Sequence, residues 1–274
     1  MSFNTYKCIF DNNVELKIDN YIGNDNDIKK MYDFYNGGSL LLREQKKRII
    51  ITNLINNNVL DKNKNFIDGG SFLGDTTLPL ALNINGIVFS IDPGDINIDI
   101  INNLTKLNNI KNVKTLKYCL GSTCGKLFYN KGPYANNFNS FSTQNGDLEY
   151  SIDSISLDEL CNTKIIENID FIHIDVENLE TEVLKGSEKI IYKYNPIIIF
   201  EGHIKSFKIG VKDSIRFLNN MNYIIYMIDE DAGNINDARN FIAIPKERYE
   251  NFKNNFDYFD FLLDETVYYP LIIN

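Results

Sequence analysis

The chain has 274 residues, and its 28 Lys and Arg against 37 Asp and Glu give a formal net charge of −9 at pH 7. The length fits one large α/β domain or two small ones, and the 43% hydrophobic and 24% charged fractions exclude wholesale disorder. The excess of negative charge argues against a protein that grips a nucleic-acid backbone. The longest apolar runs, such as residues 197–200, have the length of a buried strand rather than of a membrane span.

The N-terminus and the cysteines predict the cellular compartment. The first residues lack the basic and apolar segments of a secretory signal. Four scattered cysteines form no C-x-x-C pair, which favours free thiols in a reducing compartment. We therefore expect a cytoplasmic protein with no membrane partner, and the oligomeric state is left open.

Residues 1–60 do not share the pattern of the rest of the chain. They predict a helix over 27–35, a Gly-Gly break at 37–38 and a second helix over 41–56. Residues 43–48 within the second helix are interpreted as a solvated face of mixed charge, with a basic patch as the alternative. We expect an N-terminal helical cap packed on a sheet.

From residue 65 onward, short β-branched runs alternate with helical patterns. Strands are expected over 66–68, 86–91, 113–120, 169–174, 196–201, 223–228 and 241–244. Helices are expected over 74–81, 96–107 and 179–192, and the polar stretches 131–150 and 231–240 are expected to be loops. This alternation predicts βαβ units and, over residues 61–274, a mostly parallel seven-stranded α/β sheet with helices on both faces.

The stretch I-D-G-G-S-F-L-G-D at 67–75 lies where the first of these strands turns into a helix. Gly70 would allow the backbone to approach a ligand, and Gly74 would let the helix start close to the strand. The spacing G-G-x-x-x-G differs from the G-x-G-x-x-G of dinucleotide enzymes, and Asp68 adds an acid at the strand end. A carboxylate there suits a ligand that carries an ammonium or sulfonium group.

The second strand ends at Asp92, and Pro93 follows it. A carboxylate at this point can accept hydrogen bonds from the hydroxyls of a ribose. The glycine turn and Asp92 together favour S-adenosylmethionine over a nicotinamide dinucleotide. A Gly-rich turn and a solvated acid in an unrelated α/β protein are the alternative interpretation.

Four segments of the C-terminal half form a family pattern: S-L-D-E-L at 156–160, I-D-F-I-H-I-D-V-E-N-L-E at 169–180, V-L-K-G at 183–186 and P-I-I-I-F-E at 196–201. They resemble the T-L-D-D-L, I-D-F-I-K-I-D-V-E-G-A-E, V-L-x-G-A and P-x-I-x-x-E segments of FkbM methyltransferases. The glycine turn and Asp92 fit the same family, and the resemblance covers about residues 65–245. His173 stands where the family usually has Lys, and Asn178 where it usually has Gly, a mild change if the backbone there is left-handed.

The resemblance implies a Rossmann-like class I methyltransferase fold that binds S-adenosylmethionine and methylates a hydroxyl. Asp175 and Glu177, at the end of the fourth strand, would face the transferring methyl group. The residues implied at the cofactor lie at the glycine turn or just after strands: Asp68, Gly69, Gly70, Ser71, Gly74, Asp75, Asp92, Pro93, Gly121, Ser122 and Asp175.

A hydroxyl is a poor nucleophile until a base removes its proton. The chain has two histidines, His173 and His203, and both map near the carboxyl ends of strands predicted to be neighbours. We rank His203 first as the base and Asp175 second. For His173, a structural role is the more favoured interpretation.

Carboxylates gather at the same predicted edge. Asp175, Glu177 and Glu180 could form a cluster with Glu201, although Glu177 and Glu180 could instead cap the helix that follows them. Asp175, Glu201 and His203 could bind a divalent cation, but without a tight ligand motif we predict no metal.

The sequence therefore predicts an S-adenosylmethionine-dependent O-methyltransferase that acts on a small-molecule or glycan hydroxyl. The main alternative is a non-catalytic binding or scaffold protein that keeps the methyltransferase fold. A nicotinamide-dependent reductase ranks below it. Nucleic-acid methylation ranks lowest, because Asn195-Pro196 continues as Ile-Ile-Ile and not as the N-P-P-Y of base methyltransferases.

Overall fold

The computed structural model describes a defined part of the chain. Its described residues are 4–8, 14–18, 41–131, 138–142, 150–202, 208–230, 239–257, 259–266 and 268. The expected helix over 27–35, the expected Gly-Gly break at 37–38 and His203 lie outside these residues. So do residues 231–238 of the loop expected over 231–240, and that expectation is wrong at Asn240, which begins a strand.

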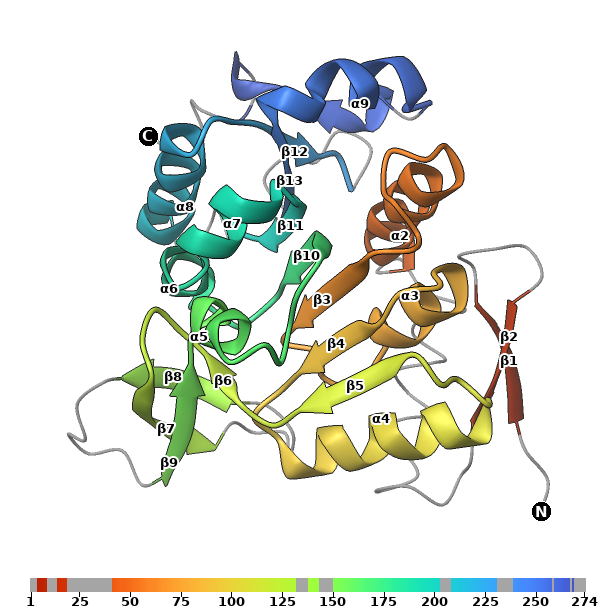
Figure 1. The fold of residues 1–274 in the computed structure, drawn as a ribbon, viewed down its shortest axis with the longest axis vertical. Coiled ribbons are helices and arrows are strands. Elements are labelled where there is room, and N and C mark those ends of the chain that lie inside the picture. The colour runs from red at the N-terminus through yellow and green to blue at the C-terminus, as the bar shows by residue number, and fades with distance from the viewer. Residues whose placement is uncertain are drawn as a thin grey trace.

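Eight strands form the central sheet, in the order β14–β12–β13–β11–β10–β3–β4–β5 (Figure 1). Their bounds are β3 (Asn65–Gly69), β4 (Val88–Ile91), β5 (Val113–Leu116), β10 (Ile169–Ile174), β11 (Ile197–Glu201), β12 (Tyr223–Ile228), β13 (Asn240–Pro245) and β14 (Leu262–Leu263). Strands β11, β10, β3, β4 and β5 are parallel, and β13 is antiparallel to both of its neighbours. The predicted Rossmann-like α/β class is confirmed. The two-residue strand β14 is an addition to the seven strands expected from the sequence.

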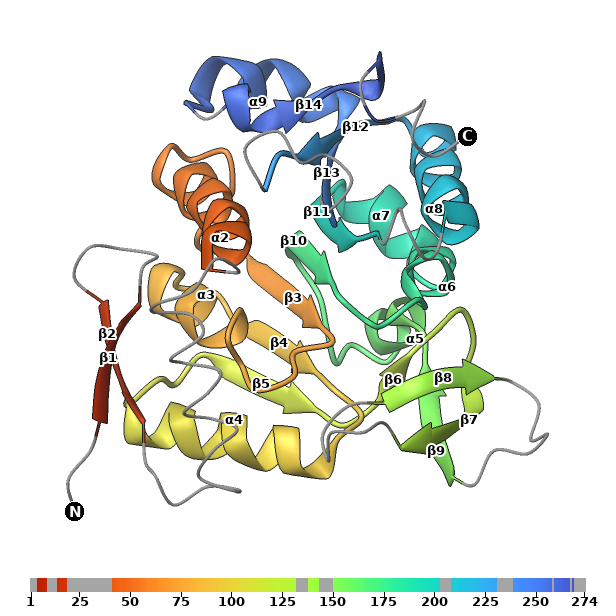
Figure 2. The same cartoon turned by 180° about the vertical axis from the view of Figure 1, so that it is seen from behind.

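A second sheet lies beyond the carboxyl ends of β3, β4 and β5 (Figure 2). Its strands, in the order β6–β9–β7–β8, are β6 (Cys119–Leu120), β9 (Tyr150–Ile155), β7 (Gly125–Lys131) and β8 (Phe138–Ser142). The single strand expected over 113–120 is therefore two strands in two sheets, and the loop expected over 131–150 is wrong at 131, 138–142 and 150. The polar sequence of this region hides the strands, since antiparallel backbone pairing needs no continuous apolar run.

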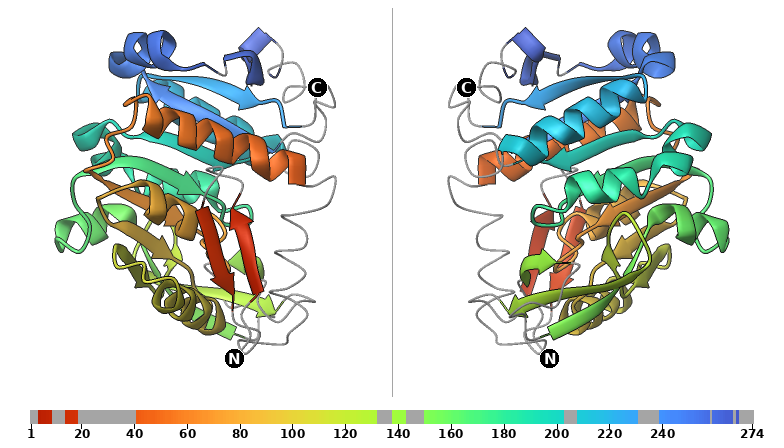
Figure 3. Two further views of the ribbon diagram at one scale, coloured as in Figure 1. Left: turned by 90° about the vertical axis from the view of Figure 1, so that its right-hand side faces the viewer. Right: turned by 90° about the vertical axis from the view of Figure 1, so that its left-hand side faces the viewer.

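Helices cover both faces of the central sheet (Figure 3). One face carries α5 (Leu157–Asn162), α6 (Glu180–Lys185), α7 (Glu188–Tyr194) and α8 (Lys208–Asn220), and the other carries α2 (Leu41–Asn56), α3 (Thr77–Asn83) and α9 (Tyr249–Asn255). Helix α4 (Asp95–Leu107) follows β4 and lies beside β5. Alternate strand residues feed two buried clusters: Ile172 enters the first, and Phe171 the second. Among the described helices, none is long and apolar enough to cross a membrane.

The helix expected over 179–192 is interrupted. A Cβ placed on Gly186 would lie 2.2 Å from the carbonyl oxygen of Gly121, so the backbone of the segment after β6 packs directly against the break between α6 and α7. The Asp158 carboxylate then accepts the backbone N–H of Ile190 at 2.9 Å, which caps the new helix. Tertiary contacts therefore divide one helical pattern into two helices.

The N-terminal region contains a hairpin as well as a helix. Strands β1 (Asn4–Cys8) and β2 (Val14–Ile18) pair antiparallel, so the expected helical cap contains a hairpin that the sequence analysis did not predict. The alternation V-E-L-K-I is typical of a strand with one face buried. Helix α2 has the predicted bounds, and Ile50 and Leu54 enter the same buried cluster as the central strands. A domain boundary at residue 60 stays a prediction.

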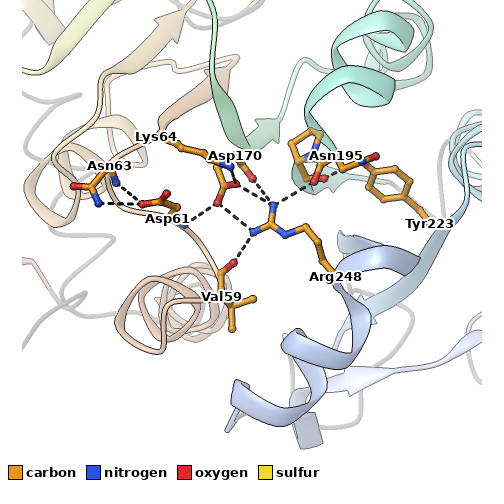
Figure 4. A network of polar contacts seen from close by, with 9 residues as sticks. Val59, Asp61, Asn63, Lys64, Asp170, Asn195, Tyr223 and Arg248 are labelled. Atoms are coloured by element: carbon orange, nitrogen blue, oxygen red, sulfur yellow. Dashed lines mark hydrogen bonds and ion pairs between the residues drawn. The ribbon is translucent and has the colours of Figure 1, made fainter.

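The amino end of β10 is held by a buried ionic network (Figure 4). The Asp170 carboxylate contacts the Arg248 guanidinium through two contacts of 3.2 Å, and Lys64 Nζ at 3.3 Å. It also accepts the backbone N–H of Asp61 at 2.7 Å, while Arg248 donates to the carbonyl of Asn195 at 3.2 Å. Arg248 ends the 3-10 helix η2 (Lys246–Arg248), so this network ties the C-terminal part of the chain to the start of the central strand.

Candidate active site

The glycine turn after β3 lies directly against the end of β10. Gly70 has φ of +81°, and a Cβ placed on it would come within 1.7 Å of the carbonyl oxygen of Asp175. The Asp175 N–H donates to the carbonyl of Gly69 at 2.9 Å. Glycine is thus required at position 70 because the backbone of Asp175 leaves no room for a side chain. A contact of Gly70 with a ligand stays a prediction. Two motifs that are a hundred residues apart in the sequence form a single contact.

The rest of the turn packs onto the elements beside it. Gly74 has φ of +85°, and a Cβ there would lie 3.0 Å from Ile101 of α4. Helix α3 begins only at Thr77, so Gly74 shapes the turn before the helix rather than its first residue. Ser90 donates from its hydroxyl to that of Ser71 at 2.8 Å, which joins the turn to β4.

Asp92 binds the glycine turn from the end of β4. One carboxylate oxygen accepts the backbone N–H of Phe72 at 2.9 Å, and the other accepts the N–H of Gly94 at 2.7 Å and the amide of Asn97 at 2.9 Å. Burial raises the pKa of the Asp92 carboxyl to about 6, against the lowering effect of these donors. Pro93 separates Asp92 from the start of α4. Hydrogen bonds therefore join the predicted ribose acceptor to the glycine turn and to the start of α4.

Asp68 and His173 form a buried pair across β3 and β10. Nδ1 of His173 lies 2.7 Å from one carboxylate oxygen of Asp68, and the Thr77 hydroxyl donates to the other at 2.5 Å. Both Asp68 oxygens thus contact protein, and a role for Asp68 against the cofactor stays a prediction. Nε2 of His173 is buried and has no hydrogen-bond partner among the described residues. This imidazole is held at one nitrogen and left open at the other.

The segment after β10 makes a turn of unusual conformation. Glu177 and Asn178 both have positive φ, +54° and +74°, so the left-handed backbone that makes Asn a mild replacement for Gly is confirmed. Glu177 is exposed and Asp175 is half-buried. The Glu180 carboxylate accepts the backbone N–H groups of Val176 and Asn178. Glu180 therefore stabilises the turn that precedes α6. It is also the acidic first residue of α6, in line with the alternative interpretation that it charges the first turn of that helix.

Carboxylates also meet at the ends of β11 and β12. Glu201 is buried, and Arg239 Nη1 lies 3.3 Å from its Oε1. Burial raises the pKa of the Glu180 carboxyl to about 7, and the charge of Glu201 adds to the rise, so these two groups are electrostatic neighbours. Glu230, buried after β12, accepts the backbone N–H of Arg239 at 2.8 Å. Across the part of the chain that the structure describes, no three His, Cys, Asp or Glu side chains are placed to hold a metal ion.

Helix α2 reaches the glycine turn through a charge pair that the sequence did not reveal. Arg48 Nη2 lies 2.9 Å from Asp75 Oδ2, and both side chains are largely buried. Lys47 is 1% exposed. The interpretation of residues 43–48 as a solvated face is therefore wrong for Lys47 and Arg48. The reason is long-range: Arg48 faces a carboxylate supplied 27 residues later in the chain.

Gly121 and Ser122, which the family resemblance implies at the cofactor, follow β6 of the second sheet. They line a hollow of about 550 Å³ together with Leu179 and Glu182 from the start of α6. A Cβ placed on Gly69 would lie 2.7 Å from a methyl of Leu120, so β6 crosses over the glycine turn. The second sheet thus brings Gly121 and Ser122 to the carboxyl edge, although β5 itself ends at Leu116.

The structure gathers most of the predicted site residues at one edge of the central sheet. Asp68, the glycine turn, Asp92, Asp175 and Glu201 all lie at or next to the carboxyl ends of β3, β4, β10 and β11. Thr77, Arg48 and Arg239 were missed, since an isolated threonine or arginine carries no local signal. Glu180 belongs to a recognised motif, but its partners could be found only from the shape of the turn.

A comparison with known protein families gives a match to this chain. The family model described as "Methyltransferase FkbM domain" matches residues 68–225. No curated protein matches the chain.

Solved structures with a similar fold share little sequence with this chain. An FkbM methyltransferase from Methylobacillus flagellatus KT is 16% identical with a TM-score of 0.49, covering 67% of this chain and 44% of its own. The bifunctional kinase-methyltransferase WbdD is 13% identical with a TM-score of 0.47, covering 78% and 41%. A putative methyltransferase from Streptococcus mutans in complex with SAH is 15% identical with a TM-score of 0.46, covering 71% and 94%.

This chain thus spans less than half the length of the Methylobacillus protein. The family match covers more than half of the present chain and includes the glycine turn, Asp92 and the turn after β10. The chain therefore belongs to the FkbM methyltransferase family.

Proposed function

We propose that this protein is an S-adenosylmethionine-dependent O-methyltransferase that methylates a hydroxyl of a sugar, a glycan or a related natural product. The observation that carries the proposal is the buried Asp92 carboxylate, which binds the glycine turn at the carboxyl edge of the sheet. Ligands of open α/β sheets bind outside the carboxyl ends of the strands. The class of acceptor rests on the family resemblance.

The groups at this edge suit S-adenosylmethionine in their hydrogen-bonding capacity and in their charge. A carboxylate offers about four lone-pair sites, and three N–H donors occupy Asp92, which leaves acceptor capacity for a ribose hydroxyl. Among the described residues, Asp68, Asp75, Asp92, Asp175 and Glu201 place carboxylates at this edge, and Arg48 and Arg239 are each paired with one of them. A net negative surrounding stabilises a sulfonium cation.

The chain's own residues would position the acceptor and take up its proton. S-adenosylmethionine, when bound, supplies a methyl group bonded to a positively charged sulfur. In-line transfer requires the acceptor oxygen to be close to that methyl group and aligned with the leaving sulfur. Asp175 is a candidate to orient the hydroxyl because its backbone is fastened to the glycine turn. His203 remains our first proposal for the base, and Asp175 our second.

Binding of S-adenosylhomocysteine, measured by calorimetry, tests the cofactor site. We expect Asp92→Ala to weaken binding about 10- to 100-fold, since hydrogen bonds to a charged group are worth about 1.5–3 kcal/mol. Asp99→Ala is the matched control, because Asp99 is an exposed aspartate on the following helix. This variant should bind S-adenosylhomocysteine as tightly as the wild type does. Undiminished binding by Asp92→Ala would contradict the assignment of this site.

Transfer of labelled methyl groups from S-adenosylmethionine to sugars and oligosaccharides tests the reaction. The proposal expects alkali-stable label on the acceptor, as for a methyl ether. Tight binding of S-adenosylhomocysteine without transfer to any hydroxyl acceptor would favour the non-catalytic alternative. Binding of NAD(H) in place of the sulfonium cofactor would overturn both.

A further inference from the structure

The turn after β10 has a backbone conformation that its residues do not favour. Glu177 and Asn178 are consecutive non-glycine residues with φ of +54° and +74°. Left-handed backbone places Cβ too close to the following carbonyl oxygen, and Asn tolerates it better than Glu does. A contact beyond the backbone preferences of these two residues must therefore hold this turn.

Glu180 supplies that restraint. Its Oε1 accepts the backbone N–H of Val176 at 3.1 Å and the N–H of Asn178 at 3.2 Å, on either side of Glu177. The Glu180 side chain is buried, with 5% of its surface exposed. A single oxygen thus gathers the two N–H groups that the left-handed turn aims inward.

Asp175 is restrained from the opposite side by the glycine turn. Its N–H donates to Gly69, and its carbonyl oxygen lies where a Cβ on Gly70 would be. Two contacts therefore restrain Asp175. Its backbone packs against the glycine turn, and the turn that follows it in the sequence is held by Glu180. Loss of either restraint would let Asp175 and Glu177 move relative to the cofactor site.

The charge of Glu180 is not needed for this contact. Glu180 is buried beside Glu201, and burial together with that charge raises its carboxyl pKa to about 7. A protonated carboxyl or an amide keeps one carbonyl oxygen that can accept both N–H groups. Glu180→Gln should therefore preserve the geometry, and Glu180→Ala should abolish it.

We infer that Glu180 is a positioning residue for the methyl transfer: it holds the left-handed turn at Glu177 and Asn178, and thereby the placement of Asp175 and Glu177 at the reacting groups. The inference rests on the proposed function. It assigns Glu180 no contact with substrate or cofactor, and it explains how a chain with Asn at position 178 keeps a turn that glycine would adopt freely.

Steady-state kinetics with the full chain test the inference. We expect Glu180→Ala to lower kcat at least tenfold while affinity for S-adenosylhomocysteine changes less than threefold. Glu180→Gln should stay within about fivefold of the wild type in kcat. The matched control is Glu188→Ala, because Glu188 is the exposed first residue of α7 as Glu180 is the buried first residue of α6.

A second substitution tests the coupling to the backbone. Adding Asn178→Gly to Glu180→Ala should raise kcat at least fivefold above that of Glu180→Ala alone, because glycine adopts the left-handed turn without the restraint. In the wild-type background the same substitution should change kcat less than twofold. Equal kcat losses in the single and double variants would overturn the inference, as would a parallel loss of cofactor affinity. If Glu180→Ala does not fold, Glu180→Asp, which is one methylene shorter, takes its place with the same expectations.

Hydrogen exchange separates this inference from the proposed function. Amides of segment 175–179 should exchange at least tenfold faster in Glu180→Ala than in the wild type or Glu180→Gln, measured without substrate. Unchanged exchange in this segment would overturn the inference even if the enzyme is active. A wild-type protein that shows the expected exchange but transfers no methyl group would instead overturn the proposed function.

Discussion

The two ends of β10 differ in how completely their buried polar side chains are hydrogen-bonded. At its amino end, the Asp170 carboxylate receives Arg248, Lys64 and a backbone N–H. At its carboxyl end, His173 has Asp68 at one ring nitrogen and, among the described residues, no partner at the other. Buried polar atoms are almost always hydrogen-bonded, so an open one marks a place where a ligand, a water or a proton belongs. The saturated end serves stability, and the open end lies at the proposed active site.

The largest expected effect is on stability at the amino end. Asp170→Ala would leave Arg248 without its buried carboxylate, and breaking such a pair costs about 3–5 kcal/mol of the free energy of unfolding. Urea denaturation measures this loss. Asp153→Ala is the control, because the pair of Asp153 with Lys126 is exposed and worth less than about 1 kcal/mol. Equal losses in the two variants would contradict a structural role for the Asp170 network.

A smaller effect on stability is expected at the carboxyl end. His173→Ala removes the partner of one buried Asp68 oxygen, and we expect a loss of about 2–3 kcal/mol. His173→Lys should be less destabilising than His173→Ala, because it restores the residue usual in the family and keeps a donor for Asp68. Thermal unfolding of the two variants checks the order. A lysine variant less stable than the alanine variant would show that the shape of the imidazole matters more than the pairing.

The smallest expected effect is a pH dependence of cofactor binding. Burial raises the pKa of Asp92 to about 6, so the carboxyl is mostly protonated at pH 5 and ionised at pH 8. A ribose hydroxyl donates more strongly to the ionised form, and binding near pH 6 should release a proton. We expect S-adenosylhomocysteine to bind about tenfold more weakly at pH 5 than at pH 8. Calorimetry in buffers of different ionisation enthalpy measures the proton.

Asp92→Asn is the control for this experiment and should lose both the proton release and the pH dependence. The effect of Asp92 on the stability of the fold has the opposite pH dependence to its effect on cofactor binding. A carboxyl whose folded pKa is raised stabilises the fold fully at pH values below its unfolded pKa of about 4, and this contribution is lost as pH rises through 6. Proton release that persists in Asp92→Asn would assign it to another group.

Local patterns in the sequence were enough for much of the site. The glycine turn at 67–75 and the acid at position 92 could be predicted because each follows a buried apolar strand, and strand ends of a parallel sheet share one edge. The contact of Gly70 with Asp175 could not, since the two residues lie in separate segments and meet only when β3 and β10 pair. The contacts of Glu180 could not be predicted either, because the direction of its partner N–H groups, those of Val176 and Asn178, depends on how the whole turn is folded.

The sequence by itself determined the chain order of the seven longer strands of the central sheet, the parallel α/β class and the family, because apolar periodicity and strand-end motifs act over a few residues. Only the tertiary structure decided that 113–120 belongs to two sheets, that Lys47 and Arg48 are buried, and that one helical pattern breaks at Gly186. Each of those outcomes depends on a partner far along the chain. Their free energies come from long-range packing and charge pairing, which a local pattern does not contain.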